Sequence, residues 1–545
     1  MNDIRSRSDC PLAWRARRRR AAVAVVFAIQ SAVLIAVPRA ASAAGATYVV
    51  SPAGNDGNPG TPSQPWRTIT RALRSDSPAG AGDTVLIKAG RYDENVVNAR
   101  SGSPGQPLVI AGESGTTIHP VRDGGYSDGV FTTTGTHDLV VQDLNVVADT
   151  ATVWAGFAFA DVRNVVVQRN TATRTWASGI IVYPAAGAGL VTNSNVKILN
   201  NVLSDVNIMT AKTNLAGGAF CKVDGVTMKC DQESLSVWGV DGFEIAFNRL
   251  DGGSKEGLDV KDGSRNGSVH NNDISHQARL TSSGAGLYAA GGGPALYVDG
   301  GNAELFNVDV YANVVHDNFG DGITISDEVS AGRTHDVHVY NNVVYGNDAS
   351  LGGSPLNSCL SALNGVEAVT FENNTCHDNG YSVWVQATSI GSPSGITFRN
   401  NLISASRRDP VSFISGSNLA LINNIVGPSE YKDTNASVNS GNQTVASFGF
   451  VNPGAANFRL ASGSPAIDAG TSPQYATSDA VGGVRPVGGR YDVGAFESGA
   501  GPGAAPPPPP PIPTIAPPPV TTPPAASVGE CPAAVAPSRS AGRPS

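Results

Sequence analysis

Four short segments of the chain carry the residues whose types could do chemistry. In each of them apolar residues alternate with acidic, basic, hydroxyl or aromatic ones, and the segments are 233–239, 256–262, 294–300 and 321–327. Asp259, Lys261 and Asp299 lie at positions between the apolar residues. Crowded carboxylates repel one another, and a bound cation, a neighbouring lysine or a raised pKa relieves that repulsion. Acid, base and metal ligand are therefore all candidate roles for these residues.

Aromatic residues flank these charges. When the segments are written one above another, Trp238 aligns with Lys261, and Tyr297 aligns with Asp259. Tyr183 is a third aromatic candidate for substrate contact. Aromatic rings beside an acidic group on a long shallow face form a platform on which sugar rings can lie. The plainer interpretation is a solvated ion-pair network around Lys261, which would contribute little to stability.

The elements that position these residues are marked by a phrase that recurs nine times. Each instance is an Asn, one variable residue and an apolar residue, beginning at Asn170, Asn201, Asn248, Asn272, Asn313, Asn342, Asn374, Asn401 and Asn424. The separations run from 23 to 47 residues, and repetition at this scale indicates a solenoid. The surrounding residues alternate with period two, which indicates strands. If each coil places its Asn at the same corner, the amides stack into a ladder; the alternative is that each Asn only forms a turn.

The pattern predicts an all-β fold, a single-stranded right-handed parallel β-helix with an N-terminal cap and an Asn ladder. Alternation assigns one inward stack to Leu235, Leu258, Leu296 and Ile323. Adjacent coils of such a fold lie about 4.8 Å apart. The outward residues Asp259, Lys261 and Asp299 would then share one patch.

Composition shifts along the chain suggest how it is organised. We expect a secretion signal at 1–43, an N-terminal cap with the first coils at 44–130, the β-helix at 131–450, a closing segment at 451–497 and a Pro-rich tail without a core at 498–545. In the cap, Trp66, Ile69 and Leu73 have the spacing of a short amphipathic helix that could plug the open end of the solenoid. The signal predicts an extracellular, secreted protein without stable membrane insertion once the signal is removed, and we expect a monomer.

The charge of the chain excludes one class of partner. Without residues 1–43 the chain has 29 basic and 43 acidic residues, a formal charge of −14. Nucleic-acid binding needs a basic field, so we expect no nucleic-acid partner. An acidic protein that acts on an acidic polymer needs a cation between the two.

Cysteine spacing suggests one disulfide and leaves a second open. Cys221 and Cys230 flank a short segment, which predicts a disulfide-closed hairpin in an exported chain. Cys359 and Cys376 could pair, or Cys376 could remain a buried free thiol, because it occupies the apolar position of the repeated Asn phrase.

Both ends of the folded part resemble the caps of extracellular β-helix proteins that act on polysaccharides. The stretch from Tyr48 to Thr61, followed by Pro65-Trp-Arg-Thr-Ile, resembles the N-terminal cap of pectate lyases of polysaccharide lyase family nine and their relatives. Segments 464–470 and 492–497 are similar to the closing segment of many such proteins. The resemblance spans nearly all of 46–497. It implies the architecture rather than one reaction, because lyases, hydrolases and epimerases share these caps.

The resemblance to the lyases implies calcium-assisted β-elimination on an acidic, uronate-containing glycan. In that family aspartates from consecutive coils bind calcium and a lysine removes the proton next to the uronate carboxylate. Lys261 would be the base, in a catalytic group with Asp259 and Asp299. The positions most like the family's acidic motif are Glu233, Glu256 and Asp259, and the metal ligands that we expect are Glu233, Glu256 and Asp262. This chain departs from the family where Glu replaces Asp, and where Lys261 lies on the same coil as Asp259.

Two alternatives come from other classes of protein. A glycoside hydrolase or epimerase would use two carboxylates, and Asp259 with Asp299 on the next coil suits the short spacing of a retaining hydrolase. A non-catalytic glycan-binding surface protein would use the Pro-rich tail as a spacer. Following ultraviolet absorbance and reducing ends together separates the three, because elimination raises both signals, hydrolysis raises only reducing ends, and binding raises neither.

Overall fold

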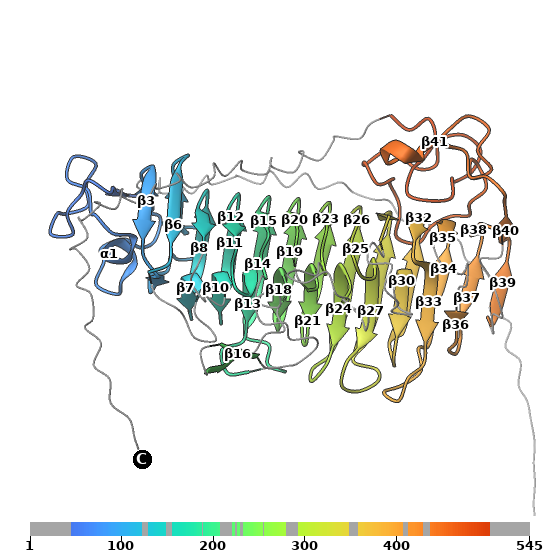
Figure 1. Cartoon of the computed structure of the whole chain (residues 1–545), viewed down its shortest axis with the longest axis horizontal. Helices are drawn as coiled ribbons and strands as arrows, with labels where there is room; N and C mark the ends of the chain where they lie inside the picture. The colour runs from blue at the N-terminus through green and yellow to red at the C-terminus, as the bar shows by residue number, and fades with distance from the viewer. Residues whose placement is uncertain are drawn as a thin grey trace, which may run out of the picture. The chain divides into compact units, whose positions relative to one another are not determined.

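The protein is described by a computed structural model. It describes residues 45–121, 129–148, 155–187, 189–207, 221–223, 226–228, 233–253, 255–278, 293–347, 358–406, 413–428 and 436–501. Within these residues, three long parallel sheets share one core, and each turn of the chain adds a strand to the sheets in order (Figure 1). This is the right-handed parallel β-helix that the sequence predicted.

The sheets are named here by their size. Sheet 1 has 14 described strands: β1 (Thr47–Val50), β2 (Thr84–Ile87), β5 (Leu108–Gly112), β8 (His137–Gln142), β11 (Arg163–Gln168), β14 (Asn193–Leu199), β19 (Val240–Ala246), β22 (Arg265–His270), β25 (Leu305–Tyr311), β28 (Thr334–Tyr340), β31 (Glu367–Glu372), β34 (Thr397–Arg399), β37 (Ala420–Ile422) and β39 (Val438–Ser440). Sheet 2 has 11 described strands: β4 (Val96–Asn98), β7 (Gly129–Thr134), β10 (Ala155–Ala160), β13 (Ser178–Tyr183), β18 (Leu235–Trp238), β21 (Leu258–Lys261), β24 (Leu296–Gly300), β27 (Ile323–Asp327), β30 (Ser358–Leu363), β33 (Tyr381–Gln386) and β36 (Phe413–Ile414). Sheet 3 has 13 described strands: β3 (Gly90–Asp93), β6 (Thr116–His119), β9 (Asn145–Val147), β12 (Thr171–Thr173), β15 (Val202–Ser204), β20 (Arg249–Asp251), β23 (Asp273–Ser275), β26 (Val314–His316), β29 (Val343–Tyr345), β32 (Thr375–Asn379), β35 (Leu402–Ser406), β38 (Ile425–Val426) and β40 (Gln443–Thr444).

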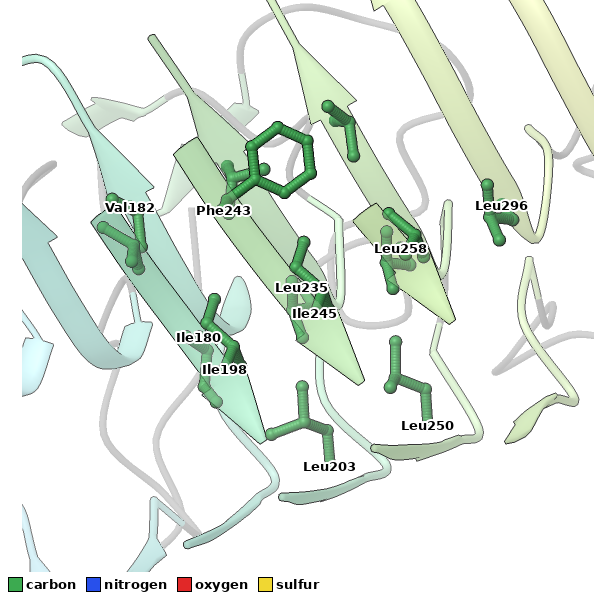
Figure 2. Close-up of a cluster of buried hydrophobic side chains, with 14 of the residues drawn as sticks. Ile180, Val182, Ile198, Leu203, Leu235, Phe243, Ile245, Leu250, Leu258 and Leu296 are labelled. Carbon is green, nitrogen blue, oxygen red and sulfur yellow. The ribbon is translucent and has the colours of Figure 1, made fainter. Parts of the chain in front are cut away.

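The core consists of stacked apolar side chains from the three sheets. In sheet 2, backbone register aligns Leu235 with Leu258, Leu258 with Leu296 and Leu296 with Ile323, and all four are fully buried. Figure 2 shows the leucines of this stack beside the side chains of sheets 1 and 3. The inward stack predicted from alternation is confirmed. Its neighbours in sequence must then point outward.

A short helix covers the first coils. Helix α1 (Ile69–Leu73) begins after Thr68, whose side chain accepts a hydrogen bond from the backbone of Arg71. Five residues are too few to hold a helix in isolation. Burial of Ile69 and Leu73 supplies the stability, as the spacing in the sequence predicted.

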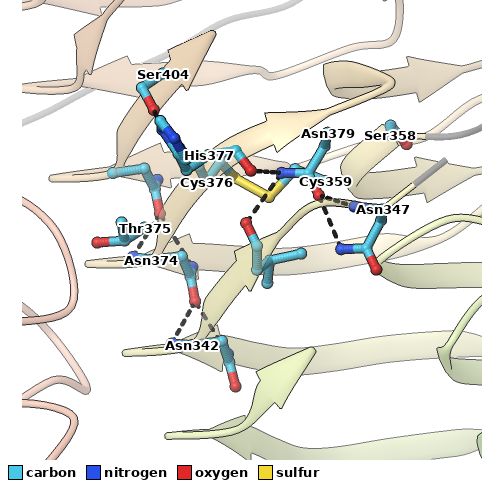
Figure 3. Close-up of a disulfide and its surroundings, with 12 residues drawn as sticks. Asn342, Asn347, Ser358, Cys359, Asn374, Thr375, Cys376, His377, Asn379 and Ser404 are labelled. Carbon is cyan, nitrogen blue, oxygen red and sulfur yellow. Dashed lines mark hydrogen bonds between the residues drawn. A yellow bond between two sulfur atoms is a disulfide. The ribbon is translucent and has the colours of Figure 1, made fainter. Parts of the chain in front are cut away.

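The Asn ladder is confirmed for all nine predicted residues. At Asn313, for example, the side-chain amide donates to Val269 O at 2.9 Å and to Asn342 Oδ1 at 3.0 Å, while Asn313 Oδ1 accepts from the side chain of Asn272 at 2.9 Å. The same links run from Asn170 to Asn424, and the structure adds Asn442 at the end. A second, shorter ladder joins Asn318, Asn347 and Asn379; Figure 3 shows its last two members and part of the first ladder.

The structure decides one of the two cysteine pairs considered from the sequence. Cys359 and Cys376 form a disulfide and are almost fully buried (Figure 3), which decides the alternative that the sequence left open. Around the other pair, β16 (Cys221–Val223) and β17 (Val226–Met228) form the expected antiparallel hairpin. Cys230 lies outside the described residues, and so do 1–44 and 502–545. The Cys221–Cys230 disulfide, the signal and the tail therefore stay predictions.

A closing segment packs beside the last coils. Strand β41 (Phe450–Asn452), the 3₁₀ helix η1 (Pro453–Ala455) and β42 (Asn457–Leu460) form a hairpin, and the chain then continues to residue 501. Buried Glu372 fixes this segment by accepting hydrogen bonds from the backbone N–H groups of 474–476. No helix among the described residues is both long and apolar enough to span a membrane.

Candidate functional site

The outer face of sheet 2 brings together the charged residues predicted from the sequence. Register pairs Lys261 with Asp299, and Asp259 with Tyr297, on the adjacent strands β21 and β24. Trp238 on β18 pairs with Lys261 from the other side. The shared outward patch is therefore confirmed as a matter of geometry.

Lys261 lies at the centre of this patch. Its Nζ is 2.8 Å from Glu233 Oε1 and 3.1 Å from Asp259 Oδ2, and its side chain is 18% exposed. Glu233, Asp259 and Asp299 are each at most 3% exposed. These four residues are called the acid cluster below. It is a buried ion-pair group, in contrast to the solvated network that the plainer interpretation of the sequence suggested.

Burial and mutual repulsion separate the pKa values within the acid cluster. Burial raises the pKa of Asp299 well above its usual range, and the charge of the neighbouring Asp259 raises it further. Burial also raises the pKa of Asp259 well above normal, against the opposing effect of Lys261. Glu233 behaves differently, because Lys261 and Lys255 outweigh its burial and lower its pKa. Lys261 thus favours the ionised form of Glu233, whereas burial favours the protonated forms of Asp259 and Asp299.

The hydrogen bonds around Asp259 and Asp299 also favour the protonated forms of these two side chains. With both aspartates ionised, Asp259 Oδ1 and Asp299 Oδ1 have no hydrogen-bond donor among the described residues. Burial without a donor disfavours the ionised form of a carboxyl group and so favours protonation of these two aspartates.

Carboxylates at the strand ends are used differently. Asp262 accepts hydrogen bonds from the backbone N–H groups of Asn302 and Ala303, at 2.6 and 2.8 Å. Asp327 accepts from the backbone of Thr334, and Asp321 from that of Ser358, in the same way. These side chains fix the turns between sheets. Asp262, predicted as a metal ligand, therefore has its oxygens engaged in a structural role.

The predicted calcium ligands do not converge in this conformation. Glu233 is paired with Lys261, Asp262 is bound to a turn, and Glu256 lies 3.4 Å from Lys255. Across the residues that the structure describes, no three His, Cys, Asp or Glu side chains are arranged to hold a metal ion. Calcium binding stays a prediction, and the side chains as placed do not fit it.

The three predicted aromatic contacts differ in their surroundings. Trp238 is half-buried, with Lys261 Nζ 5.6 Å from its ring centre and its Nε1 donating to Ser236 Oγ. Tyr297 is also half-buried beside the aspartates. Tyr183 is 7% exposed and packs in a small apolar group on the outer face of β10 and β13. Trp238 and Tyr297 therefore lie beside the charged residues of the acid cluster, whereas Tyr183 is buried.

Glu328 joins this face at the trailing corner of the strands, where its place in the sequence puts it, although it is not among the site residues assigned a role above. It is exposed, follows β27, and lies with Oε1 3.5 Å from the hydroxyl of Tyr297. Its charge helps to raise the pKa of both Asp299 and Asp259.

Comparison with known proteins supports the architecture. A family model described as "Right handed beta helix region" matches residues 221–426, and one described as "Protein of unknown function (DUF1565)" matches residues 52–100. The uncharacterized protein YwoF of Bacillus subtilis (strain 168) is 27% identical over 347 residues. That match covers 56% of this chain and 64% of YwoF, which is less than two thirds of the relative.

Solved structures with a similar fold include carbohydrate-active proteins. XylC in complex with xylose has a TM-score of 0.47 at 11% identity, covering 73% of this chain and 86% of XylC. Pectate lyase Pel9A has a TM-score of 0.40 at 15% identity, and the match covers 83% of this chain and 96% of Pel9A. The mannuronan C-5 epimerase AlgE6 A-module of Azotobacter vinelandii has a TM-score of 0.38 at 14% identity. That match covers 70% of this chain and 94% of the A-module. Likenesses this distant do not indicate a reaction or a substrate.

Proposed function

We propose that this chain is a secreted enzyme that cleaves a polysaccharide by acid–base chemistry at the acid cluster. The observation that carries the proposal is the buried group of Asp259, Asp299 and Lys261 beside half-buried Trp238 and Tyr297, in which burial raises the pKa of both aspartates. A carboxylic acid that stays protonated near neutral pH can donate its proton to the leaving oxygen of a glycosidic bond. The secretion signal expected at 1–43 would bring the enzyme to extracellular polymers.

Asp299 is the proposed general acid. It shares its strand with Tyr297, whose ring borders the solvent-accessible part of the face. Asp259 is fully buried, and its charge helps to raise the pKa of Asp299. The two aspartates lie on adjacent strands, and the charge of Asp259 acts on Asp299. We therefore assign them to one acid group, in place of the two carboxylates that flank the bond in a retaining hydrolase.

Glu328 is the proposed second carboxylate. It is exposed on the same face and is near enough for its charge to raise the pKa of Asp299. A carboxylate open to solvent can activate a water molecule, whereas Glu233 is buried against Lys261. The arrangement supports a hydrolase, the second of the functions considered from the sequence.

Calcium-assisted elimination with Lys261 as base has less support. Burial would lower the pKa of Lys261, but Asp259 and Glu233 raise it well above its usual value. A lysine held in its charged form cannot accept a proton at neutral pH. Lys261 is better assigned to holding Glu233 and Asp259 in place.

The substrate and reaction are tested together by one screen. Secreted protein is incubated with pectate, alginate, glycosaminoglycans and neutral xylans, with and without calcium, while ultraviolet absorbance and reducing ends are followed. We expect reducing ends to rise without absorbance and without a calcium requirement. A parallel rise in absorbance would instead establish elimination.

The residue roles are tested on whichever polymer is cleaved. Asp299→Asn and Glu328→Gln should each lower kcat by about 10²–10⁴-fold, the usual contribution of an acid or base. Glu304→Gln, at an exposed glutamate that follows the strand of Asp299, is the matched control and should leave kcat unchanged. Full activity of Asp299→Asn would exclude the acid cluster as the catalytic centre.

A further inference from the structure

A pocket lies at the corner between sheets 1 and 3, whereas the acid cluster lies on the outer face of sheet 2. Its volume is about 330 Å³, near the lower end of the range for ligand sites. The residues that matter are Phe247, Asn271, Tyr311, Tyr340, Asn341 and Tyr475, and they define the corner pocket. The β-helix supplies the first five, and the closing segment supplies Tyr475.

On each coil one residue turns the chain from sheet 1 into sheet 3, and these corner residues form a column along the β-helix. The closing segment contacts part of that column, and the corner pocket lies where this contact ends. Asn400 donates from its side chain to Thr471 O, Asn373 donates to Asp492 O, and Asn341 donates to Ser478 O. The next corner residues towards the N-terminus are Ala312, Asn271 and Phe247, and they line the pocket. The segment thus forms one wall, and the small side chain of Ala312 leaves space in the floor.

Stacked tyrosines form another wall. The rings of Tyr311 and Tyr340 are 5.0 Å apart and nearly parallel, and Tyr311 stacks on His270 at 4.6 Å. Because neighbouring rings cover their faces, the tyrosines offer ring edges and hydroxyl groups. Burial raises the pKa of both tyrosines, so these hydroxyls remain neutral donors and acceptors.

Asn341 and Phe247 belong to the corner residues that line the pocket. The side chain of Asn341 is 3% exposed and is held by its hydrogen bond to Ser478 O. Phe247 has φ of 59°, a left-handed conformation that it shares with Asn271, Ala312 and Asn341. The conformation therefore belongs to the corner itself, and the volume and lining of the pocket are what indicate a ligand.

The chemistry of the lining selects the class of ligand. Hydroxyls, side-chain amides and aromatic edges surround the space, and the one carboxylate in the lining, that of Asp479, is occupied by the backbone N–H groups of Val481 and Gly483. We propose that the corner pocket binds a neutral saccharide unit, giving the protein a glycan-anchoring site separate from the acid cluster. An anionic sugar would lose hydration there without meeting a cation, and should bind less well.

Calorimetric titration tests this proposal with defined probes. Xylohexaose, cellohexaose and mannohexaose are the neutral probes, and hexagalacturonate is the charged one. All are titrated into Asp299→Asn protein, so that turnover does not interfere. We expect at least one neutral probe to bind and hexagalacturonate to bind more weakly or not at all.

Variants locate the binding. Ala312→Gln fills the floor and should lower affinity at least about tenfold, while Tyr340→Phe removes one hydroxyl and should lower it about 2- to 10-fold. Ala368→Gln is the matched control, because Ala368 has nearly the same φ, 52° against 53°, but is exposed away from the pocket. Unchanged Tm in every variant shows that folding is intact.

Two results would overturn the proposal: no heat of binding from any neutral probe, or binding that Ala312→Gln leaves unchanged. Neither bears on the acid cluster, whose test is turnover.

Discussion

The Asn ladder and the acid cluster are both buried polar groups on the same coils, and they differ in how completely their hydrogen bonds are met. In the ladder, each interior Asn receives and donates bonds on both sides, as Asn313 does. In the acid cluster, oxygens of Asp259, Asp299 and Glu233 lack a donor among the residues described. A native fold satisfies nearly all its buried polar groups, so exceptions need a reason.

The difference separates structure from function. The ladder places the same residue type at the same corner of successive coils. Its amide groups are fully used in bonds within the protein, so none is free to contact a ligand. The acid cluster instead holds like charges close together in a buried place, which opposes stability and raises the pKa values of Asp259 and Asp299. The strand-end aspartates such as Asp262 belong with the ladder in this respect, since turn amides occupy their oxygens.

The largest stability effect should come from removing the one cation of the acid cluster. Lys261→Met leaves Glu233 and Asp259 without their partner, and breaking a buried ion pair costs about 3–5 kcal/mol. Urea unfolding at pH 7, followed by circular dichroism, measures the loss. Because the lowered pKa of Glu233 adds stability above its unfolded value of 4.5 and not at lower pH, the difference from wild type should narrow as pH falls through the folded pKa.

An exposed lysine provides the control for that variant. Lys197→Met removes a pair with Glu244 at 2.6 Å on the outer face of sheet 1, where both side chains are substantially exposed. Exposed pairs contribute about 0–1 kcal/mol. Equal losses for the two lysines would mean that the acid cluster is as solvated as an ordinary surface.

The ladder should respond next most strongly. Asn313→Ala orphans the bonding groups of Asn272, Asn342 and Val269, which should cost about 3 kcal/mol. Asn442→Ala makes the same change at the half-buried end of the ladder, where water can replace the lost partners, and should cost about 1 kcal/mol. The comparison uses urea midpoints. A larger loss at Asn442 than at Asn313 would contradict a ladder stabilised by burial.

Much of this could be predicted from sequence because strand alternation and the Asn phrase are local signals repeated on every coil. They correctly place Leu235 inside and Lys261 outside. Alternation does not reveal that an outward residue is buried, so Lys261 was expected on a solvated face or as a free base. It also cannot distinguish Asp262 from Asp299, because the turn that reaches Asp262 comes from residue 302, 40 positions later.

The corner pocket was beyond prediction for a related reason. It exists because the closing segment packs on the coils, as in the bond between Asn341 and Ser478, 137 residues apart. No local pattern encodes that distance. Glu328, by contrast, stands just past a strand that the alternation identified, so the sequence places it at this corner without assigning it a role.

The smallest effect on stability at neutral pH should be that of Asp299→Asn. The sign of this stability change is the sharpest test of the contrast between the acid cluster and the fully hydrogen-bonded polar groups. Raised pKa values mean that Asp259 and Asp299 bind protons in the folded protein that they release when unfolded. That contribution to stability is complete below the ordinary aspartate pKa of 3.8 and is lost as pH rises through the folded values. Asparagine mimics the protonated acid and does not titrate. The variant should therefore equal or exceed wild type in stability at pH 7 and lose that advantage at pH 4, measured by urea unfolding at both values. A variant that is less stable than wild type at pH 7 by as much as at pH 4 would show that the pKa of Asp299 is not raised and that Asp299 belongs with the satisfied aspartates of the turns.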